Sequence, residues 1–263
     1  MKKLFKMSAV ILFVLIVFSA CGRNESVSGK ITSFPPYGER VVTAIGDSIA
    51  AGYGLDSQED NYLTLFSDNI GAVLNNDAVS GYDSGDVLYC LSDEKTAADI
   101  KNADAIVVSV GGNDFFHRKD IMIDALKNAL LHGEGFFPEE VTNIYDEYEK
   151  NLSRIIDEIK NMNPDAYIIV QTVYNPFLKQ TLNFSYINVG KTANRYVTRL
   201  NDSIKNVCKT KNRVFVFDVA PEMNEDAENF YGTDEKLDIH PTKHGHATLA
   251  RVFTEKFNGL LKD

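Results

Sequence analysis

The sequence predicts an α/β fold in which helices cover both faces of a parallel sheet of about five strands. Short apolar runs alternate with longer amphipathic segments from Arg40 onward, an order typical of parallel sheets. The runs are apolar throughout, as in strands that are buried on both faces. The 263 residues, 44% hydrophobic and 24% charged, suffice for a substantial core and are typical of a globular protein.

The expected elements follow from residue type and spacing. Runs rich in Val and Ile predict strands, and a 3.6-residue apolar period predicts helices. Ligand sites in such sheets lie at the carboxyl ends of the strands. We expect extended segments at residues 41–45, 77–80, 105–110, 167–173 and 214–219, and helices at residues 62–74, 86–100, 141–162, 189–209 and 247–261.

Residues 115–140 interrupt this alternation directly after a strand end. The segment holds a short helical stretch and two pairs of phenylalanines, at 115–116 and 136–137. An aromatic insertion at the carboxyl edge of a sheet is either a lid or a wall for an acyl chain. The alternative is an ordinary packed excursion of the surface.

The N-terminal residues indicate export. Three lysines precede an apolar run at residues 10–18, which is short for a membrane span, and Ser-Ala-Cys21 follows. This end resembles a bacterial lipobox, although Phe18 stands where Leu is usual. We predict a signal peptide at residues 1–20, a lipidated Cys21 and a location on the extracytoplasmic face of the cell membrane. An uncleaved anchor or a plain signal peptide would also place the domain outside the cytoplasm.

A polar, Gly-, Ser- and Pro-rich stretch at residues 21–39 predicts a flexible tether, and one domain is expected at residues 40–263. The formal net charge is −10, and it is −13 without residues 1–20, which carry three lysines and no acids. Such a field repels phosphate backbones, so nucleic acid is not an expected partner. Cys90 and Cys208 could form a disulfide in an exported protein, but both lie in expected helices, which favours two free thiols.

Two residues at the expected carboxyl edge have the chemistry of acyl transfer, which needs a nucleophile and a base. Ser48 follows the first strand in Gly46-Asp47-Ser48, and its alternative role is a helix N-cap. His240 precedes Pro241, which presents the imidazole from a loop, although a lone histidine is more often structural.

Two further residues could stabilise an oxyanion. Asn113 follows the strand at residues 105–110, and its amide can donate a hydrogen bond to a developing negative charge. Gly81 follows the expected segment at residues 77–80, and a glycine allows a substrate close to its backbone N–H. Taken alone, each is equally explained as a turn residue.

Together these motifs resemble the SGNH (GDSL) hydrolase family, and the resemblance runs from about Arg40 to the C-terminus. It implies a flavodoxin-like three-layer α/β/α sandwich. It also implies a serine esterase that cleaves carboxylic esters, such as acyl groups on lipids or glycans, through an acyl-enzyme and without a metal or other cofactor. The matching blocks, in family order, are Gly46-Asp47-Ser48, Gly81, Gly111-x-Asn113-Asp114 and His240-Pro241.

The resemblance also assigns roles. Ser48 would be the nucleophile and His240 the base, and the oxyanion hole would consist of the Ser48 and Gly81 N–H groups and the Asn113 side chain. The family acid usually lies three residues before the histidine, where this chain has Leu237. Asp238 is therefore the predicted catalytic acid, with a backbone carbonyl or Asp234 as alternatives. Asp47 and Asp114 are expected to support their turns by hydrogen bonds.

Other site types fit less well. Asp238, His240, His244 and His246 offer zinc ligands, but the last two would point to different faces of a helix. The glycines near Ser48 lack the lysine of a P-loop and the third glycine of a dinucleotide fingerprint. The Gly-x-Ser-x-Gly elbow of α/β-hydrolases is absent at the expected spacing. The main non-enzyme alternative is a lipoprotein that binds a ligand on the same fold without catalysis.

Overall fold

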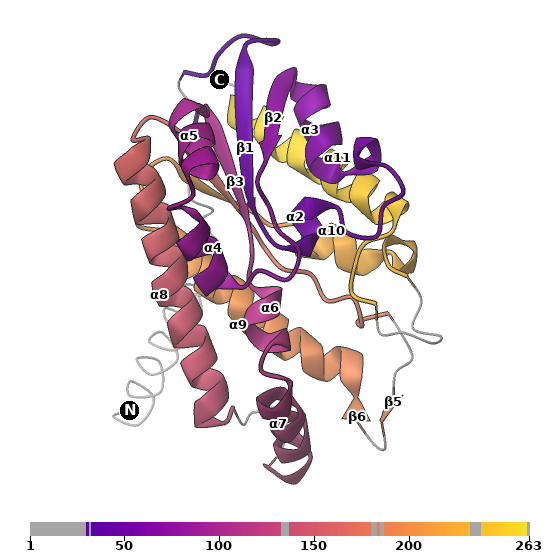
Figure 1. Cartoon of the computed structure of the whole chain (residues 1–263). Helices are drawn as coiled ribbons and strands as arrows, with labels where there is room; N and C mark the ends of the chain where they lie inside the picture. The colour runs from indigo at the N-terminus through magenta and orange to yellow at the C-terminus, as the bar shows by residue number, and fades with distance from the viewer. Residues whose placement is uncertain are drawn as a thin grey trace, which may run out of the picture.

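The computed structural model describes residues 30–31, 33–132, 137–179, 183–184, 187–231 and 238–261. A five-stranded parallel sheet forms the centre, in the order β2-β1-β3-β4-β7, with helices on both sides (Figure 1). This confirms the predicted α/β sandwich. The strands are β1 (Arg40–Gly46), β2 (Ala72–Asn76), β3 (Ala105–Ser109), β4 (Tyr167–Gln171) and β7 (Val214–Phe217).

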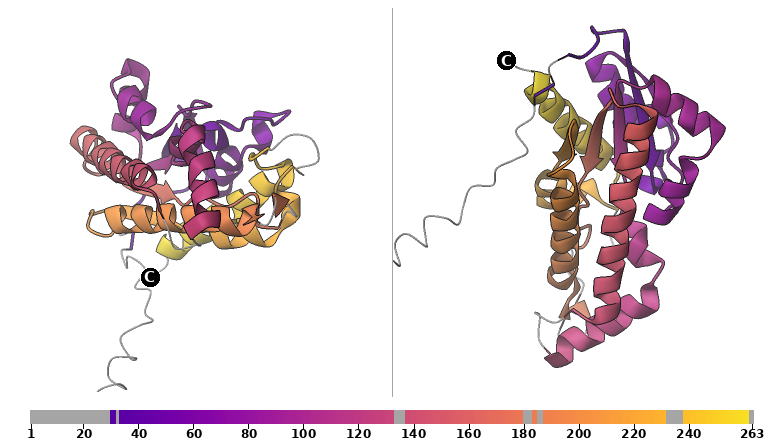
Figure 2. Two further views of the ribbon diagram at one scale, coloured as in Figure 1. Left: turned by 90° about the horizontal axis from the view of Figure 1, so that it is seen from below. Right: turned by 90° about the vertical axis from the view of Figure 1, so that its left-hand side faces the viewer.

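Each face of the sheet is covered by its own set of helices. The long helices α8 and α9 run alongside each other on one face (Figure 2). That face carries α4 (Ser84–Cys90), α5 (Glu94–Asn102), α8 (Glu139–Met162) and α9 (Val189–Cys208). The opposite face carries α2 (Ser48–Ala51), α3 (Tyr62–Ile70), α10 (Ala220–Glu225) and α11 (Lys243–Leu261).

The sheet separates two hydrophobic cores. Successive residues of a strand point to opposite faces, so β3 sends Ile106 and Val108 into the α8–α9 core and Val107 into the α3–α11 core. All residues of β3 are buried. Burial of one such side chain contributes roughly 1.5–3 kcal/mol, which explains why the central strands are mainly apolar.

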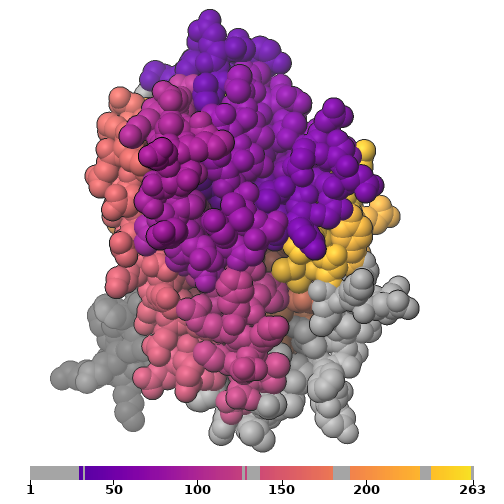
Figure 3. Space-filling model, in the orientation of Figure 1, coloured from indigo at the N-terminus to yellow at the C-terminus, as the bar shows by residue number. Residues whose placement is uncertain are grey.

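The carboxyl ends of the strands carry the irregular part of the fold. Helices α6 (Gly112–Phe116) and α7 (Lys119–His132) and the hairpin of β5 (Asn183–Phe184) and β6 (Ile187–Asn188) lie beyond these ends (Figure 1). The chain from β1 to α7 forms most of the described surface seen in Figure 3, with α11 at one edge. The strand order reverses between β1 and β3, where open α/β sheets bind ligands.

The second strand differs from its prediction. The expected segment was residues 77–80, but β2 spans Ala72–Asn76. Helix α3 ends earlier than predicted, at Ile70, because Gly71 adopts a left-handed C-cap with a φ of 64°. β2 is an edge strand, and Val73 is 62% exposed. It therefore lacks the continuous apolar run that marks the central strands.

The helix prediction for residues 86–100 was also wrong, because two helices occupy this region. α4 ends at Cys90, and Asp93 starts α5 by accepting hydrogen bonds from the N–H groups of Lys95 and Thr96. An aspartate at this position is a start signal for a helix. The short α10 was not predicted, and α11 begins four residues earlier than expected. The helices at residues 141–162 and 189–209 are confirmed within two residues at each end.

Both described cysteines, Cys90 and Cys208, are free thiols. The predicted signal peptide and Cys21 lie outside the described residues. Ile31 donates its N–H to the Leu260 carbonyl at 3.1 Å, and Phe34 packs edge-on against Phe257, so the segment before β1 contacts the domain. No helix in the described ranges is long and apolar enough to span a membrane.

Candidate active site

The turn after β1 presents Ser48 at the carboxyl edge of the sheet. Gly46 has a φ of 154°, and a Cβ there would lie 2.1 Å from the Ser109 carbonyl oxygen, so the close approach of β1 to β3 requires glycine. Asp47 then caps α2 by accepting from the Ile49 N–H at 3.0 Å. Asp47 is thus the N-cap, and the alternative in which Ser48 caps this helix is wrong. Ser48 is the first residue of α2.

His240 lies within hydrogen-bond distance of Ser48. Its Nε2 is 3.0 Å from the Ser48 Oγ, and its Nδ1 is 2.7 Å from the Asp238 Oδ1. The same carboxylate oxygen accepts from the His240 backbone N–H at 2.9 Å. The fold thus brings the loop before α11 next to the turn after β1. Asp238, the predicted acid, has the geometry to orient the imidazole, although it lies one position nearer to the histidine than the family pattern.

Tyr53 is a site residue that the sequence did not reveal. Its ring centroid lies 4.6 Å from that of His240 at an interplanar angle of 41°. Its backbone N–H donates to the Ser48 carbonyl at 3.0 Å, and the residue is 56% exposed. The ring therefore covers one side of the imidazole. No motif marked this position, because the contact depends on how two distant loops meet.

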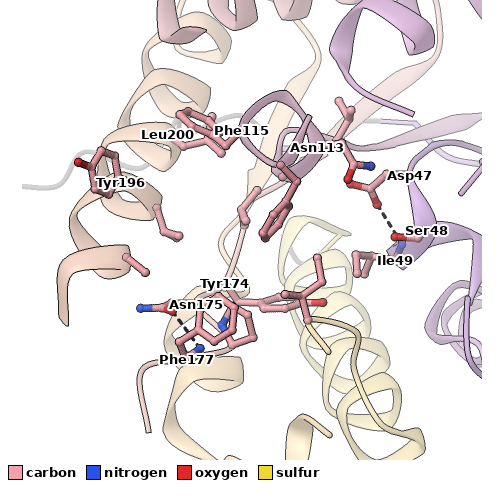
Figure 4. A pocket seen from close by; sticks show the side chains of 18 of the residues that line it. Asp47, Ser48, Ile49, Asn113, Phe115, Tyr174, Asn175, Phe177, Tyr196 and Leu200 are labelled. Atoms are coloured by element: carbon pink, nitrogen blue, oxygen red, sulfur yellow. Dashed lines mark hydrogen bonds between the residues drawn. The ribbon is translucent and has the colours of Figure 1, made fainter. Parts of the chain in front are cut away.

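Asn113 lies on the same cavity as Ser48, and Figure 4 shows its side chain beside the turn of Asp47 and Ser48. One amide hydrogen of Asn113 is directed at the Tyr82 carbonyl, 2.9 Å from Nδ2. An amide nitrogen carries two hydrogens, so the second remains available to a substrate oxygen. Gly81 precedes Tyr82 and has a φ of 90°, with no heavy atom within 4 Å of where its Cβ would be. The space beside Gly81 is therefore open, although Gly81 is not among the residues that line the cavity.

Asp47 and Asp114 support their turns, as predicted. Asp114 accepts hydrogen bonds from the backbone N–H and the hydroxyl of Ser84, which ties α6 to α4. Burial raises the pKa of Asp114 to about 6 and that of Asp47 to about 7. Both carboxyls are turned inward and are engaged in the scaffold of the site.

A cavity of about 720 Å³ extends from Ser48 between α6, α7, α9 and the end of β4. Its size is typical of a small-molecule site. Much of its wall is apolar or aromatic, and Figure 4 shows several of these side chains around the open space. The apolar wall includes Phe115, Phe116, Met122, Ile123, Val173, Phe177, Tyr196, Val197 and Leu200.

The insertion at residues 115–140 therefore contributes a wall to this cavity. Phe115 and Phe116 line it directly. Phe137 is partly buried and instead packs against the core on the α8–α9 face, with its ring centroid 5.3 Å from that of Tyr196 and the Arg199 guanidinium 5.0 Å from its ring. Phe136 lies outside the described residues.

The alternative zinc ligands Asp238, His240, His244 and His246 do not converge on one point. His244 pairs with Asp226 at 3.0 Å, and the buried His246 accepts from the Tyr62 N–H through Nδ1 at 3.3 Å. Burial lowers the pKa of His246 to about 4. These two side chains therefore have hydrogen-bond partners other than His240. In the described chain, three-residue groups that could hold a metal occur at Asp83, Asp86 and His117, and at Asp226, Glu228 and His244.

Two known proteins and a solved structure are similar to this chain over most of its length. The chain is 26% identical to the Uncharacterized protein YpmR of Bacillus subtilis over 270 residues, covering 99% of each chain. It is 22% identical to the Spore germination lipase LipC of Bacillus licheniformis over 227 residues, covering 84% of this chain and 97% of the relative. The solved structure of the lipase Lip_vut3 from a goat rumen metagenome matches with a TM-score of 0.66 and 18% identity, covering 85% of this chain and 100% of that one.

The family profile of the GDSL-like Lipase/Acylhydrolase family matches residues 44–248. This range spans most of the chain and includes Ser48, Asn113 and His240. The chain therefore belongs to the GDSL-like Lipase/Acylhydrolase family and is an ester hydrolase of the GDSL type.

Proposed function

We propose that the protein hydrolyses carboxylic esters of acyl groups, carried by lipids or glycans, through an acyl-enzyme on Ser48. The observation that carries this proposal is the hydrogen-bonded line of Ser48, His240 and Asp238 at the opening of an apolar cavity. The nucleophile and its base are in contact, and the adjoining space suits an acyl chain. No step requires a metal.

In the first half of the reaction, Ser48 Oγ attacks the ester carbonyl carbon and its proton passes to His240 Nε2. Asp238 holds the proton on Nδ1 and stabilises the imidazolium that forms. When the tetrahedral intermediate collapses, the bond to the leaving alcohol breaks and His240 gives its proton to that oxygen. The acyl group remains on Ser48.

In the second half, water replaces the alcohol. His240 Nε2 takes a proton from the water as its oxygen attacks the acyl carbon. Collapse of this second intermediate breaks the bond to Ser48 Oγ, and the proton returns from His240 to the serine. The products are a free carboxylic acid and the unchanged enzyme.

Both intermediates place negative charge on the former carbonyl oxygen. The Ser48 and Gly81 N–H groups and the free Asn113 amide hydrogen are the donors we assign to it. Asn113→Ala is expected to lower kcat by about 10²–10³-fold, the usual effect of losing one such donor, with a smaller change in KM. Steady-state kinetics on a p-nitrophenyl ester measure this, and an unchanged kcat would remove Asn113 from the oxyanion site.

The direct test of the function uses p-nitrophenyl esters from acetate to laurate. We expect turnover that changes with chain length, because each additional CH₂ buried in the cavity contributes about 0.8 kcal/mol. Binding of the esters without release of p-nitrophenol would favour a non-catalytic ligand-binding protein. If the protein neither bound nor hydrolysed any of these esters, both the esterase hypothesis and the ligand-binding hypothesis would be contradicted.

We also propose that the protein is exported and anchored to the extracytoplasmic face of the membrane through Cys21. The lysines, the apolar run and the Ser-Ala-Cys21 end of the N-terminal segment support this. In cells that express the full chain, we expect it in the membrane fraction, with a mature N-terminal peptide that begins at a lipid-modified Cys21. An unmodified Cys21 in that peptide, or a Cys21→Ser variant with the same modification mass, would contradict the anchor.

A further inference from the structure

The cavity has a polar end at the carboxyl edge of the sheet. Ser109 ends β3 and Gln171 ends β4, and the pairing of Val108 with Val170 places them side by side. Gln171 is 4% exposed and Ser109 is 3% exposed, yet both line the cavity. Ser109 also pairs with Gly46, two residues before Ser48. The polar end of the cavity therefore borders the nucleophile turn.

Gln171 has unused hydrogen-bonding capacity at this end. Its Oε1 is buried and has no partner among the residues that the structure describes. A buried acceptor without a partner is costly, and native proteins seldom leave one in this state. Leucine would fill the same space without that cost, so the glutamine points to a ligand group that donates to it.

Tyr174 offers a second polar group of the same kind. It is 5% exposed, lines the cavity, and has a buried hydroxyl that lacks a partner in the described chain. Burial and the nearby Asp47 carboxyl raise its pKa well above the ordinary value, so the hydroxyl stays protonated and can donate. Figure 4 shows the Tyr174 ring between Asn175 and Ile49 at the side of the cavity.

The charges around the cavity do not favour an anionic ligand group at this end. Of the described lining residues, Asp47 and Lys119 have acidic or basic side chains. Asp47 is engaged in capping α2, and Lys119 is exposed on α7, so neither supplies a buried positive charge that would pair with a carboxylate or phosphate. A neutral hydroxyl suits the site best, because it can donate to Gln171 and accept from a tyrosine.

We propose that the cavity selects acyl groups that carry a hydroxyl close to the ester carbonyl, with that hydroxyl bound by the buried Gln171 amide. The rest of the chain extends along the apolar wall toward Phe116 and Ile123. This inference rests on the proposed esterase function and specifies its substrate class. It makes Gln171 a specificity-determining residue with no part in the bond-breaking steps.

The test compares the p-nitrophenyl esters of octanoate, 2-hydroxyoctanoate and 3-hydroxyoctanoate. In the unaltered protein we expect at least one hydroxylated ester to exceed octanoate by about 10-fold in kcat/KM, the scale of one hydrogen bond to a buried acceptor. Gln171→Met has a side chain of similar length without a hydrogen-bonding carbonyl, so it should reduce this preference to near the intrinsic reactivity ratio of the esters. The ratio within one variant does not depend on how much of the protein is active.

Met122→Leu is the matched control, because it changes the apolar wall while leaving Gln171 in place. It should alter the rates of all three esters by a similar factor, so their ratios stay as in the unaltered protein. Equal use of all three esters by the unaltered protein, or a hydroxyl preference that survives in Gln171→Met, would overturn the proposal while leaving the esterase function intact. No turnover of any ester would contradict the function itself.

Discussion

Replacing Ser48 with alanine is expected to lower kcat by on the order of 10⁵–10⁶-fold, since no other group in the described site can form the acyl-enzyme. The change removes only the hydroxyl, whose described side-chain contact is His240 at 3.0 Å. Alanine is compatible with the first turn of α2. The free energy of unfolding should therefore change by no more than about 1 kcal/mol. Ester kinetics and a thermal melt together measure both effects.

Ser92→Ala is the matched control for this variant. Ser92 is exposed, and its hydroxyl donates to the Tyr89 carbonyl at 2.7 Å, far along the chain from the site. We expect full activity in this control. Retained turnover in Ser48→Ala would contradict the assigned nucleophile, and loss of the cooperative melt in that variant would show that Ser48 has a structural role.

The second large effect is expected at the base. His240→Ala should lower kcat about as much as Ser48→Ala, and the double variant should be no worse, because the two residues act as one unit. Asp238→Ala should lower kcat by about 10⁴-fold, roughly ten to one hundred times less than His240→Ala, since the acid orients the histidine without exchanging bonds with the substrate. Kinetics on one ester for all the variants measure these ratios.

His244→Ala is the control for these two variants. This histidine follows the same loop but pairs with the exposed Asp226, so its loss should leave kcat unchanged. If Asp238→Ala behaved like this control, a backbone carbonyl or Asp234 would be the support of His240. If Asp238→Ala lowered kcat as much as His240→Ala, Asp238 would be indispensable for His240 to act as the base.

The fold was predictable where a strand is buried on both faces. The apolar runs of β1, β3, β4 and β7 clearly predict strands, because side chains of both hydrophobic cores pack against them. β2 was misplaced, since its outer edge faces solvent and its burial is mixed. The boundary between α4 and α5 depends on a single cap at Asp93, which a periodicity of apolar residues does not reveal.

Positions at strand ends were predictable in the site, and contacts between loops were not. Ser48, Asn113 and His240 stand in recognisable motifs, and the topology brings them to one edge. Asp238 was the predicted acid, but a backbone carbonyl and Asp234 stayed open beside it, because a shift of one residue changes where a side chain points. Tyr53 and Gln171 gave no sequence signal. Gln171 ends a strand like any other polar residue, and its importance depends on the cavity around it.

The most direct test of the Ser48–His240 pair is reaction of the protein with a fluorophosphonate, followed by mass spectrometry of its peptides. A serine becomes phosphonylated by such a reagent when a neighbouring base activates it. We expect one adduct per chain, on Ser48, with little labelling in Ser48→Ala and strongly slowed labelling in His240→Ala. An unlabelled protein, or an adduct on another serine, would contradict the claim that Ser48 and His240 form the catalytic pair.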